Sequence, residues 1–384
     1  MWPATQSLSS SARRRGFTIV ELLIVIVIIG ILATIVIVAY NGIKARADEA
    51  SLQSEVSQLN KKLLTYKVTN SDALPVDAAT GGFTVANNHT LYYRVAPDGK
   101  NYCLASSMQG DPTVAYSVVS TQSAVKKGTC EGYVVVPGSA TFSTSDFWVM
   151  KYEAKNVSGR ALSQAASTPW VNISQTDSIS TSAASCDGCH LISEAEWMTI
   201  AANVLGVASN WSSGTVGSVY IFSGHNDNSP ANSLAATTDD NDGYNGTGQT
   251  TGSSQRRTLT LTNGEVIWDF PGDVWEWTTG TIAGGQQPGL SGEVTYAIKQ
   301  WNNGSLLFNG LPSASRPSAI SGTVAGYSST QGIGQFYSNY GEAAARSFRR
   351  GGNFNNPSDV GVLALSLINP ATYTSASIGF RVSR

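Results

Sequence analysis

Residues 186–190 (Cys-Asp-Gly-Cys-His) bring two thiols and an imidazole into one short segment, a pattern compatible with a metal site, a redox centre or a disulfide. A zinc site would need a second group of ligands, and the only other histidines in the chain are His89 and His225. A thioredoxin-like centre would need a strand–helix context that is missing here. We therefore predict a local disulfide between Cys186 and Cys189 and no metal.

Residues 239–245 (Asp-Asp-Asn-Asp-Gly-Tyr-Asn) gather oxygen-rich side chains around a glycine turn, and calcium prefers oxygen ligands. The spacing differs from that of an EF-hand loop, which ends on a glutamate. The segment favours a hydrated polar loop, with a calcium site as the alternative. No other cofactor is predicted.

An isolated carboxylate, Glu21, lies within an apolar run that covers residues 17–40. The run is long enough to cross a bilayer as a helix, and the arginines at 13–15 favour a cytoplasmic N-terminus. A carboxylate near the bilayer centre costs about 2.5–3.5 kcal/mol, so Glu21 is expected to have a partner. A plain signal anchor is the alternative. A cleavable secretory signal, however, would place small residues after its apolar core, whereas Gly16 precedes it.

Residues 15–22 (Arg-Gly-Phe-Thr-Ile-Val-Glu-Leu) resemble the prepilin signature of type IV pilins and pseudopilins. The resemblance implies that prepilin peptidase cleaves after Gly16 and that the new terminus, Phe17, is N-methylated. It also implies that Glu21 pairs with the N-terminal ammonium of a neighbouring pilin subunit, and such a buried pair can set subunit register. The expected location is the cytoplasmic membrane before assembly and the cell surface or pilus afterwards.

The helix that follows the apolar run changes to an amphipathic pattern. Apolar residues recur at four–three spacing with charged residues between them. The members of this stripe are Leu52, Val56, Leu59, Leu63 and Tyr66. A coiled-coil seam is one interpretation, but the pilin resemblance favours packing on a small sheet. We predict a leader at 1–16, a transmembrane and filament helix at 17–66, and a small pilin head at 67–130.

Residues 90–95 and 114–119 alternate in the manner of strands, and turn residues separate them. A short antiparallel sheet against the helix accounts for both segments. Cys103 and Cys130 bracket the second half of this head, where a disulfide would stabilise a small core. Two unpaired buried thiols are the alternative, and export favours the disulfide.

The overall composition indicates an exported protein that is rich in turns. Charged residues make up only 13% of the 384 residues, and there are 38 glycines. The net charge is −2, so no global basic field exists to bind nucleic acid, and none is expected as a partner.

The C-terminal region, residues 131–384, is expected to be a separate domain with its own core. One helix is predicted in it, at 193–204, where Ser193 and Glu196 have the spacing of a capping box. Strands are predicted at 147–152, 257–261 and 265–268. The loops are long, which favours a functional role for them.

Five segments of this region, in order, resemble the formylglycine-generating-enzyme (sulfatase-modifying factor) domain, a variant of the C-type lectin fold. They are FWVMKYE at 147–153, LISEAEW at 191–197, GDVWEW at 272–277, RRGGNF at 349–354 and GFRV at 379–382. The resemblance implies an α+β chain whose pilin helix and small antiparallel sheet precede a loop-rich C-type lectin-like domain. Enzymes of that family hold copper with two cysteines late in the domain, but no cysteine follows Cys189 here. We therefore predict that the chain is not an enzyme.

Residues 353–378 contain no Lys, Glu, Gln, Trp or Met and are rich in Asn, Ser, Ala, Leu and Val. This segment resembles the variable region of proteins diversified by retroelements, in which adenines of Asn codons are randomised. The resemblance implies an exposed, variable ligand-binding site, and a low-charge strand–loop segment is the alternative. The residues that fit such codons are Phe354, Asn355, Asn356, Ser358, Asp359, Ser366, Ile368, Asn369, Tyr373 and Ser375.

These observations predict a pilin-like surface protein that displays a C-type lectin-like domain for an unknown protein or glycan ligand. The expected partners are prepilin peptidase, other pilin subunits and the membrane. A structural minor pilin or pseudopilin without ligand binding is the first alternative. A formylglycine-generating type of modifying enzyme is the second.

Overall fold

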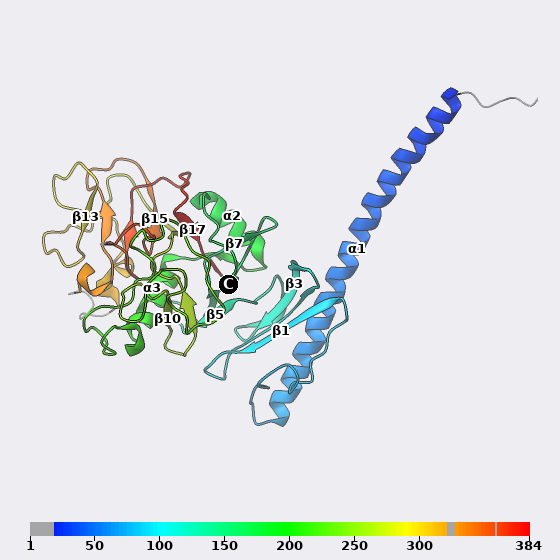
Figure 1. Cartoon of the computed structure of the whole chain (residues 1–384), viewed down its shortest axis with the longest axis horizontal. Helices are drawn as coiled ribbons and strands as arrows, with labels where there is room; N and C mark the ends of the chain where they lie inside the picture. The colour runs from blue at the N-terminus through cyan, green and yellow to red at the C-terminus, as the bar shows by residue number, and fades with distance from the viewer. Residues whose placement is uncertain (1–18, 321–326, 358) are drawn as a thin grey trace, which may run out of the picture. The chain divides into compact units, whose positions relative to one another are not determined.

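The computed structural model describes residues 19–320, 327–357 and 359–384. The chain divides between Ser51 and Leu52 into two compact units. Helix α1 (Ile19–Thr69) begins in the first unit, and none of the residues in its most apolar window, which has a mean hydropathy of 3.5, is buried. By length and composition this helix can cross a membrane (Figure 1).

The C-terminal end of α1, which belongs to the second unit, packs on a four-stranded antiparallel sheet. Its strand order is β1-β2-β3-β4, formed by His89–Val95, Tyr102–Met108, Asp111–Val119 and Gln122–Lys127. Val56, Leu59 and Leu63 of the helix are buried against Leu104 and Val118 of the sheet. The amphipathic stripe thus packs on a small sheet, as predicted, because each element covers the apolar face of the other.

The remaining strands form two further sheets and two hairpins. A six-stranded mixed sheet has the order β13-β14-β16-β15-β12-β17, and a four-stranded sheet has the order β5-β6-β18-β9. The hairpins are β7-β8 and β10-β11. The bounds are β5 Tyr133–Val136, β6 Phe147–Met150, β7 Lys155–Val157, β8 Arg160–Leu162, β9 His190–Leu191, β10 Thr258–Thr260, β11 Val266–Trp268, β12 Trp275–Ile282, β13 Ala297–Lys299, β14 Phe336–Ser338, β15 Arg346–Arg350, β16 Leu365–Ser366, β17 Ile378–Phe380 and β18 Val382–Ser383.

Two α-helices lie among these strands (Figure 1, green). Helix α3 (Glu194–Leu205) starts at the predicted capping box, in which Ser193 Oγ accepts from the Glu196 N–H and the Glu196 carboxylate accepts from the Ser193 N–H at 2.8 Å. Helix α2 (Gln175–Ser185) was not predicted, because its Ser/Thr-rich sequence carries no apolar stripe. It buries serines instead, and Ser174 caps its N-terminus.

Short 3₁₀ turns complete the domain at Ala208–Asn210, Ser313–Ser315, Pro317–Ala319 and Ser329–Gln331. Strands β6, β10 and β11 confirm the three strands predicted for this region. Much of the chain between α3 and β14 consists of loops, as the many turn residues predicted. The predicted α+β architecture is therefore confirmed.

A buried ion pair joins the two larger sheets at the end of the chain. The guanidinium of Arg381 bonds Glu276 of β12 at 2.8 Å, and both side chains are fully buried. It also donates to the carbonyls of Met150 in β6 (2.8 Å) and Trp268 in β11 (2.9 Å). Arg381 therefore bonds groups from three strands, of which β6 lies far from β11 and β12 in the sequence.

We expect Arg381→Met to destabilise the fold by about 3–5 kcal/mol, because it leaves the Glu276 carboxylate buried without a counter-charge. Equilibrium urea unfolding measures this cost. The double variant Arg381→Met/Glu276→Met should recover part of it, since the orphaned charge is gone. Arg346→Met is the matched control, because Arg346 pairs with Glu342 in a partly exposed site and its loss should cost less than about 1 kcal/mol.

Candidate functional site

The predicted ligand segment, residues 353–378, lies between two anchored arginines. At its N-terminal side Arg350 of β15 is fully buried and bonds Glu194 of α3 at 2.6 Å. At its C-terminal side is the Arg381–Glu276 pair. Between them, residues 360–367 are all buried and include β16, which lies between β14 and β15. The segment is therefore one buried strand with a loop on each side, and both ends are fixed.

The ten predicted ligand residues fall into three groups by exposure. Seven lie in the loops and are partly or fully exposed: Phe354, Asn355, Asn356, Ile368, Asn369, Tyr373 and Ser375. Two are buried, with Asp359 8% exposed and Ser366 1% exposed. Ser358 lies outside the described residues. The structure thus places most of the set at the surface, but Asp359 and Ser366 need a rearrangement before they could touch a ligand.

Four of the ten residues surround Trp275 of β12 and Arg349 of β15. The Trp275 ring donates through Nε1 to Asn356 Oδ1 at 2.9 Å, and the Arg349 guanidinium lies 5.0 Å from the ring centroid. Ser366 is opposite Arg349 in the β15–β16 ladder. Tyr373 and Asp359 are close enough to affect the pKa of Arg349. We call this group the Trp275–Arg349 centre.

The other predicted residues are held by separate contacts. Phe354 stacks on His225 with the ring centroids 6.2 Å apart. The carbonyl of Asn369 accepts from the Ser347 N–H, and the carbonyl of Ser375 accepts from the Asn172 N–H, each at 2.9 Å. These bonds fix the backbone of the loops, and conformational freedom is left mainly to the side chains.

Arg349 is a candidate site residue that the sequence did not single out. Burial lowers its pKa to about 10, and the nearby Tyr373 and Asp359 oppose that shift, so the guanidinium is charged at neutral pH. Its Nε is buried and has no hydrogen-bond partner among the described residues. Arg349 belongs to the RRGGNF segment, which was interpreted as framework. Arg349 and Arg350 are adjacent in β15, so their side chains lie on opposite faces of the sheet.

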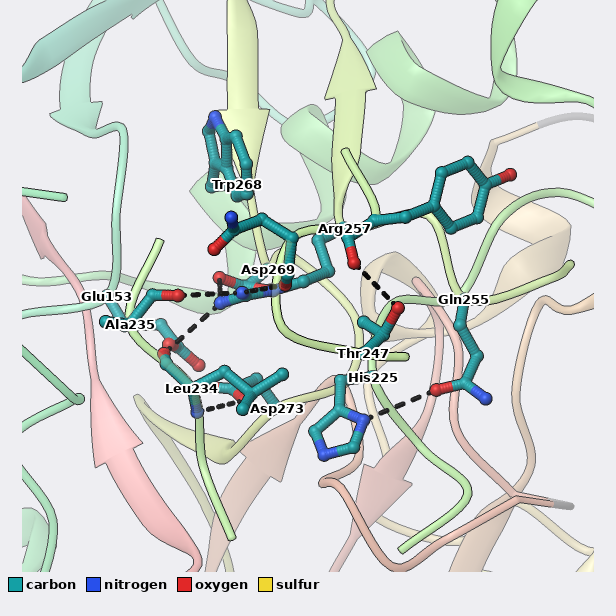
Figure 2. A network of polar contacts seen from close by, with 12 residues as sticks. Glu153, His225, Leu234, Ala235, Thr247, Gln255, Arg257, Trp268, Asp269 and Asp273 are labelled. Atoms are coloured by element: carbon teal, nitrogen blue, oxygen red, sulfur yellow. Dashed lines mark hydrogen bonds and ion pairs between the residues drawn. The ribbon is translucent and has the colours of Figure 1, made fainter. Parts of the chain in front are cut away.

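A second polar cluster is completely buried beneath β11 and the loop before β12 (Figure 2). Arg257 bonds both oxygens of Asp269 at 2.7 Å and donates to the carbonyl of Ala235. Asp273 Oδ1 accepts from the Leu234 N–H at 2.8 Å. One carboxylate oxygen each of Glu153, Asp269 and Asp273 lies within 4.8 Å of the others. Glu153 and Asp273 lie in the FWVMKYE and GDVWEW segments, but the sequence did not predict the cluster.

The charges of this cluster do not balance. Glu153, Asp269, Asp273 and Glu276 face only three cations, Lys155, Arg257 and Arg381, and all seven are at most 1% exposed. Burial raises the pKa of Asp273 to about 6 and raises that of Glu153 well above its usual range. A divalent cation fits poorly, because Arg257 already occupies both oxygens of Asp269 and Lys155 adds a further positive charge.

The cysteine–histidine run predicted at 186–190 is a structural element. Cys186 and Cys189 form one disulfide, and Cys103 and Cys130 form the other. His190 Nε2 lies 2.9 Å from Glu196, the capping-box glutamate of α3, and Glu196 also accepts from Ser383 Oγ at 2.6 Å. The histidine therefore ties β9 to the start of α3 and to the last strand.

The acidic loop at 239–245 uses its carboxylates within the fold. Asp240 bonds Lys151 at 2.7 Å and accepts from Trp268 Nε1 at 2.8 Å. Asp239 accepts from the side chain of Asn241, and Asp242 accepts from the side chain of Asn245. These contacts favour the hydrated polar loop over the calcium alternative.

At the N-terminus, Glu21 lies in the first turn of α1. Gly16 and Phe17, the predicted processing residues, lie outside the described residues. Their role remains a prediction from the sequence.

Two families match this chain. The "Prokaryotic N-terminal methylation motif" matches residues 11–37, and the "Sulfatase-modifying factor enzyme 1-like domain" matches residues 114–384. These matches confirm both resemblances seen in the sequence and, with the described elements, the predicted fold class. The first match and the apolar helix indicate insertion into a membrane and assembly with other pilin subunits.

Curated relatives match only the N-terminal part of the chain. Type II secretion system core protein G of Klebsiella pneumoniae is 42% identical over 87 residues, which cover 23% of this chain and 62% of that protein. The same protein of Dickeya chrysanthemi is 42% identical over 59 residues, or 15% of this chain and 39% of the relative. A fimbrial protein of Dichelobacter nodosus is 34% identical over 99 residues, which cover 26% of this chain and 61% of that protein. The chain thus spans less than two thirds of each of these relatives.

Solved structures with some likeness to the chain include two variants of a Major Tropism Determinant. The P3c variant has a TM-score of 0.29 and 15% identity and covers 66% of this chain and 52% of its own. The U1 variant has a TM-score of 0.30 and 13% identity, and the match covers 78% of this chain and 72% of the U1 variant. These TM-scores are too low for either structure to inform the function.

The His190–Glu196 contact should make stability depend on pH. The hydrogen bond to Glu196 raises the pKa of His190 above its ordinary value of 6.5, although burial opposes the shift. The contribution is therefore complete below pH 6.5 and is lost as the pH rises through the raised folded-state value. Because 45% of the His190 side chain is exposed, solvent screening limits it to about 0.5–1 kcal/mol.

We expect His190→Gln to destabilise the domain at pH 6 and to have a smaller effect at pH 9, as measured by urea unfolding at both pH values. A loss that is equal at both pH values would contradict a charged contact. His89→Gln is a control for histidine replacement elsewhere in the chain, since His89 contacts Glu55 of α1.

Proposed function

We propose that this chain, which belongs to the family of sulfatase-modifying factor enzyme 1-like domains, uses its C-terminal region as a non-enzymatic ligand-binding domain displayed on a type IV pilin-like anchor. The proposed division is a leader at 1–16, a membrane and filament helix at 17–66, a pilin head at 67–130 and the lectin-like domain at 131–384. The ligand face is formed by the loops of residues 353–378 around the Trp275–Arg349 centre. The proposed final location is the cell surface or a pilus.

One observation carries this proposal: the exposed residues of the segment lie in loops whose ends and middle are fixed by buried contacts. Arg350–Glu194 and Arg381–Glu276 hold the ends, and β16 holds the middle. Side chains such as Asn355 and Tyr373 can therefore change without removing any core contact. A rigid frame that presents Tyr, Phe, Asn and Ser resembles the way antibody loops combine aromatic contact with adaptable hydrogen bonding.

The chemistry of the cysteines supports a non-enzymatic role. A copper-dependent oxidase of the formylglycine-generating type needs two thiolates late in the domain. The last cysteine here is Cys189, and its thiol is engaged in the disulfide with Cys186. Copper-dependent oxidation of a cysteine peptide by the purified protein would instead support the enzyme.

A structural minor pilin is the second candidate. It is favoured by the curated relatives, whose similarity covers 26% of the chain or less. In this case the large domain would decorate a filament without binding a ligand. The size of that domain favours a minor or tip position over continuous packing along a fibre.

The pilin part of the proposal predicts that mass spectrometry of the mature protein finds residues 1–16 removed and Phe17 methylated. Glu21→Ala should be processed but fail to assemble, because the carboxylate no longer pairs with the ammonium of the neighbouring subunit. Leu22→Ala, an apolar change at the adjacent position, is the matched control. Normal assembly of Glu21→Ala, or retention of the leader, would contradict the proposal.

The ligand-face part predicts that sister isolates differ at the exposed loop positions and agree at residues 360–367. Sequencing the locus across isolates measures this directly. Asn355→Tyr and Tyr373→Asn should change the free energy of unfolding by no more than about 0.5 kcal/mol, because both side chains are exposed. An invariant segment across isolates would favour the structural pilin instead.

A further inference from the structure

Three ionisable groups in the buried cluster have atoms without hydrogen-bond partners. They are Glu153 Oε2, Asp273 Oδ2 and Lys155 Nζ, and none has a partner among the described residues. The three residues are at most 1% exposed. A buried polar atom without a partner costs about 1–3 kcal/mol, and more if charged, so three such atoms in one cluster call for an explanation.

The other charged groups of the cluster are already engaged. Both oxygens of Asp269 accept from Arg257, and Glu276 accepts from Arg381. Glu153 and Asp273 are therefore the two carboxyls of the cluster that no arginine engages, and Lys155 Nζ has no hydrogen-bond partner among the described residues. Both of these carboxyls lie close enough to influence the pKa of Lys155.

Burial shifts the pKa of all three groups toward their uncharged forms. Burial lowers the pKa of the Lys155 ammonium, raises that of Asp273 to about 6 and raises that of Glu153. An uncharged amine is a nucleophile, and an uncharged carboxylic acid is the form that can lose its hydroxyl as water. Moving one proton from the amine to the carboxyls thus prepares the cluster for condensation.

We propose that Lys155 and Asp273 form an intramolecular isopeptide bond and that Glu153 relays the proton. Lys155 Nζ attacks Asp273 Cγ, and the new N–C bond forms as the C–OH bond breaks. Glu153 accepts a proton from the nitrogen and delivers one to the departing hydroxyl, which leaves as water. The step is a condensation without a change in oxidation state, so no oxidant, reductant or cofactor is needed.

The backbone geometry is suited to this reaction. Glu153 and Lys155 are two positions apart on either side of Ala154, whose N–H and C=O bond Phe380 and Trp170. In such an extended segment alternate side chains point to the same side. Glu153 Oε1 accepts from the Val274 N–H at 3.3 Å, next to Asp273. The long, flexible side chain of Lys155 has to rotate to bring Nζ onto Asp273 Cγ.

After condensation the cluster would be satisfied. The bond removes one cation and one carboxylate, which leaves Glu153, Asp269 and Glu276 with Arg257 and Arg381. One protonated carboxyl, Glu153, then makes the cluster neutral and can donate a hydrogen bond to the new amide. The bond would join the β7 hairpin covalently to the loop that precedes β12. This inference does not depend on the ligand-binding proposal.

Intact mass spectrometry of the purified full chain, after reduction of both disulfides, tests the bond. The mass should be lower than that of the mature polypeptide by one water molecule. Proteolysis should release a branched peptide that joins the segments containing Lys155 and Asp273. A reduced mass equal to that of the unmodified polypeptide would overturn the proposal and leave a shared proton as the explanation of the cluster.

Three variants identify the reacting atoms. Lys155→Met and Glu153→Gln should both show the full polypeptide mass, because one lacks the nucleophile and the other lacks the proton relay. Asp273→Asn should instead lose one ammonia, since the leaving group is then the amide nitrogen. Asp273→Asn should also fold normally, because the asparagine side-chain oxygen can still accept the hydrogen bond from the Leu234 N–H. A loss of water in Lys155→Met would overturn the assignment.

Discussion

The guanidinium of Arg381 is the contact on which the architecture of the C-terminal domain depends. Arg381 lies in the chain between β17 of the six-stranded sheet and β18 of the four-stranded sheet. Its guanidinium bonds Glu276, Met150 and Trp268. Met150 is more than a hundred residues away from Trp268 and Glu276 along the chain, and Arg381 itself is more than a hundred residues beyond all three. A buried cation is costly unless every donor is used, so the sheets can come together only in the arrangement that satisfies it.

This constraint explains how a domain with so many loops can present a stable face. Arg350 anchors the start of the candidate ligand segment to α3, and Arg381 anchors its end, while β16 is buried between two neighbouring strands. The loops between these anchors can vary because they contribute little to the core. Trp275 and Arg349 belong to the framework beneath these loops, where the buried Trp275 ring donates to Asn356 and the Arg349 guanidinium lies over that ring.

Covalent and ionic contacts reinforce the apolar core, which includes all four disulfide cysteines. The disulfides link Cys103 to Cys130 in the small sheet region and Cys186 to Cys189 beside α3. His190 and Glu196 connect the second disulfide to the last strand through Ser383. The Glu153, Lys155 and Asp273 cluster stands out because its groups are buried but incompletely bonded, and this is what distinguishes it from the satisfied arginine pairs.

The sequence by itself determined the features that arise from local pattern. The apolar run with Glu21, the amphipathic stripe from Leu52 to Leu63 and the Ser193–Glu196 capping box each depend on residues within a few turns of one another. Helix α2 was missed because its serines give no apolar period, and its burial depends on the surrounding strands. Only the tertiary structure decided that Asp359 and Ser366 are buried, that Arg349 lies over the Trp275 ring, and that Lys155 is buried in the same region as Glu153 and Asp273. These outcomes depend on strand register and on contacts between distant segments, which no local pattern encodes.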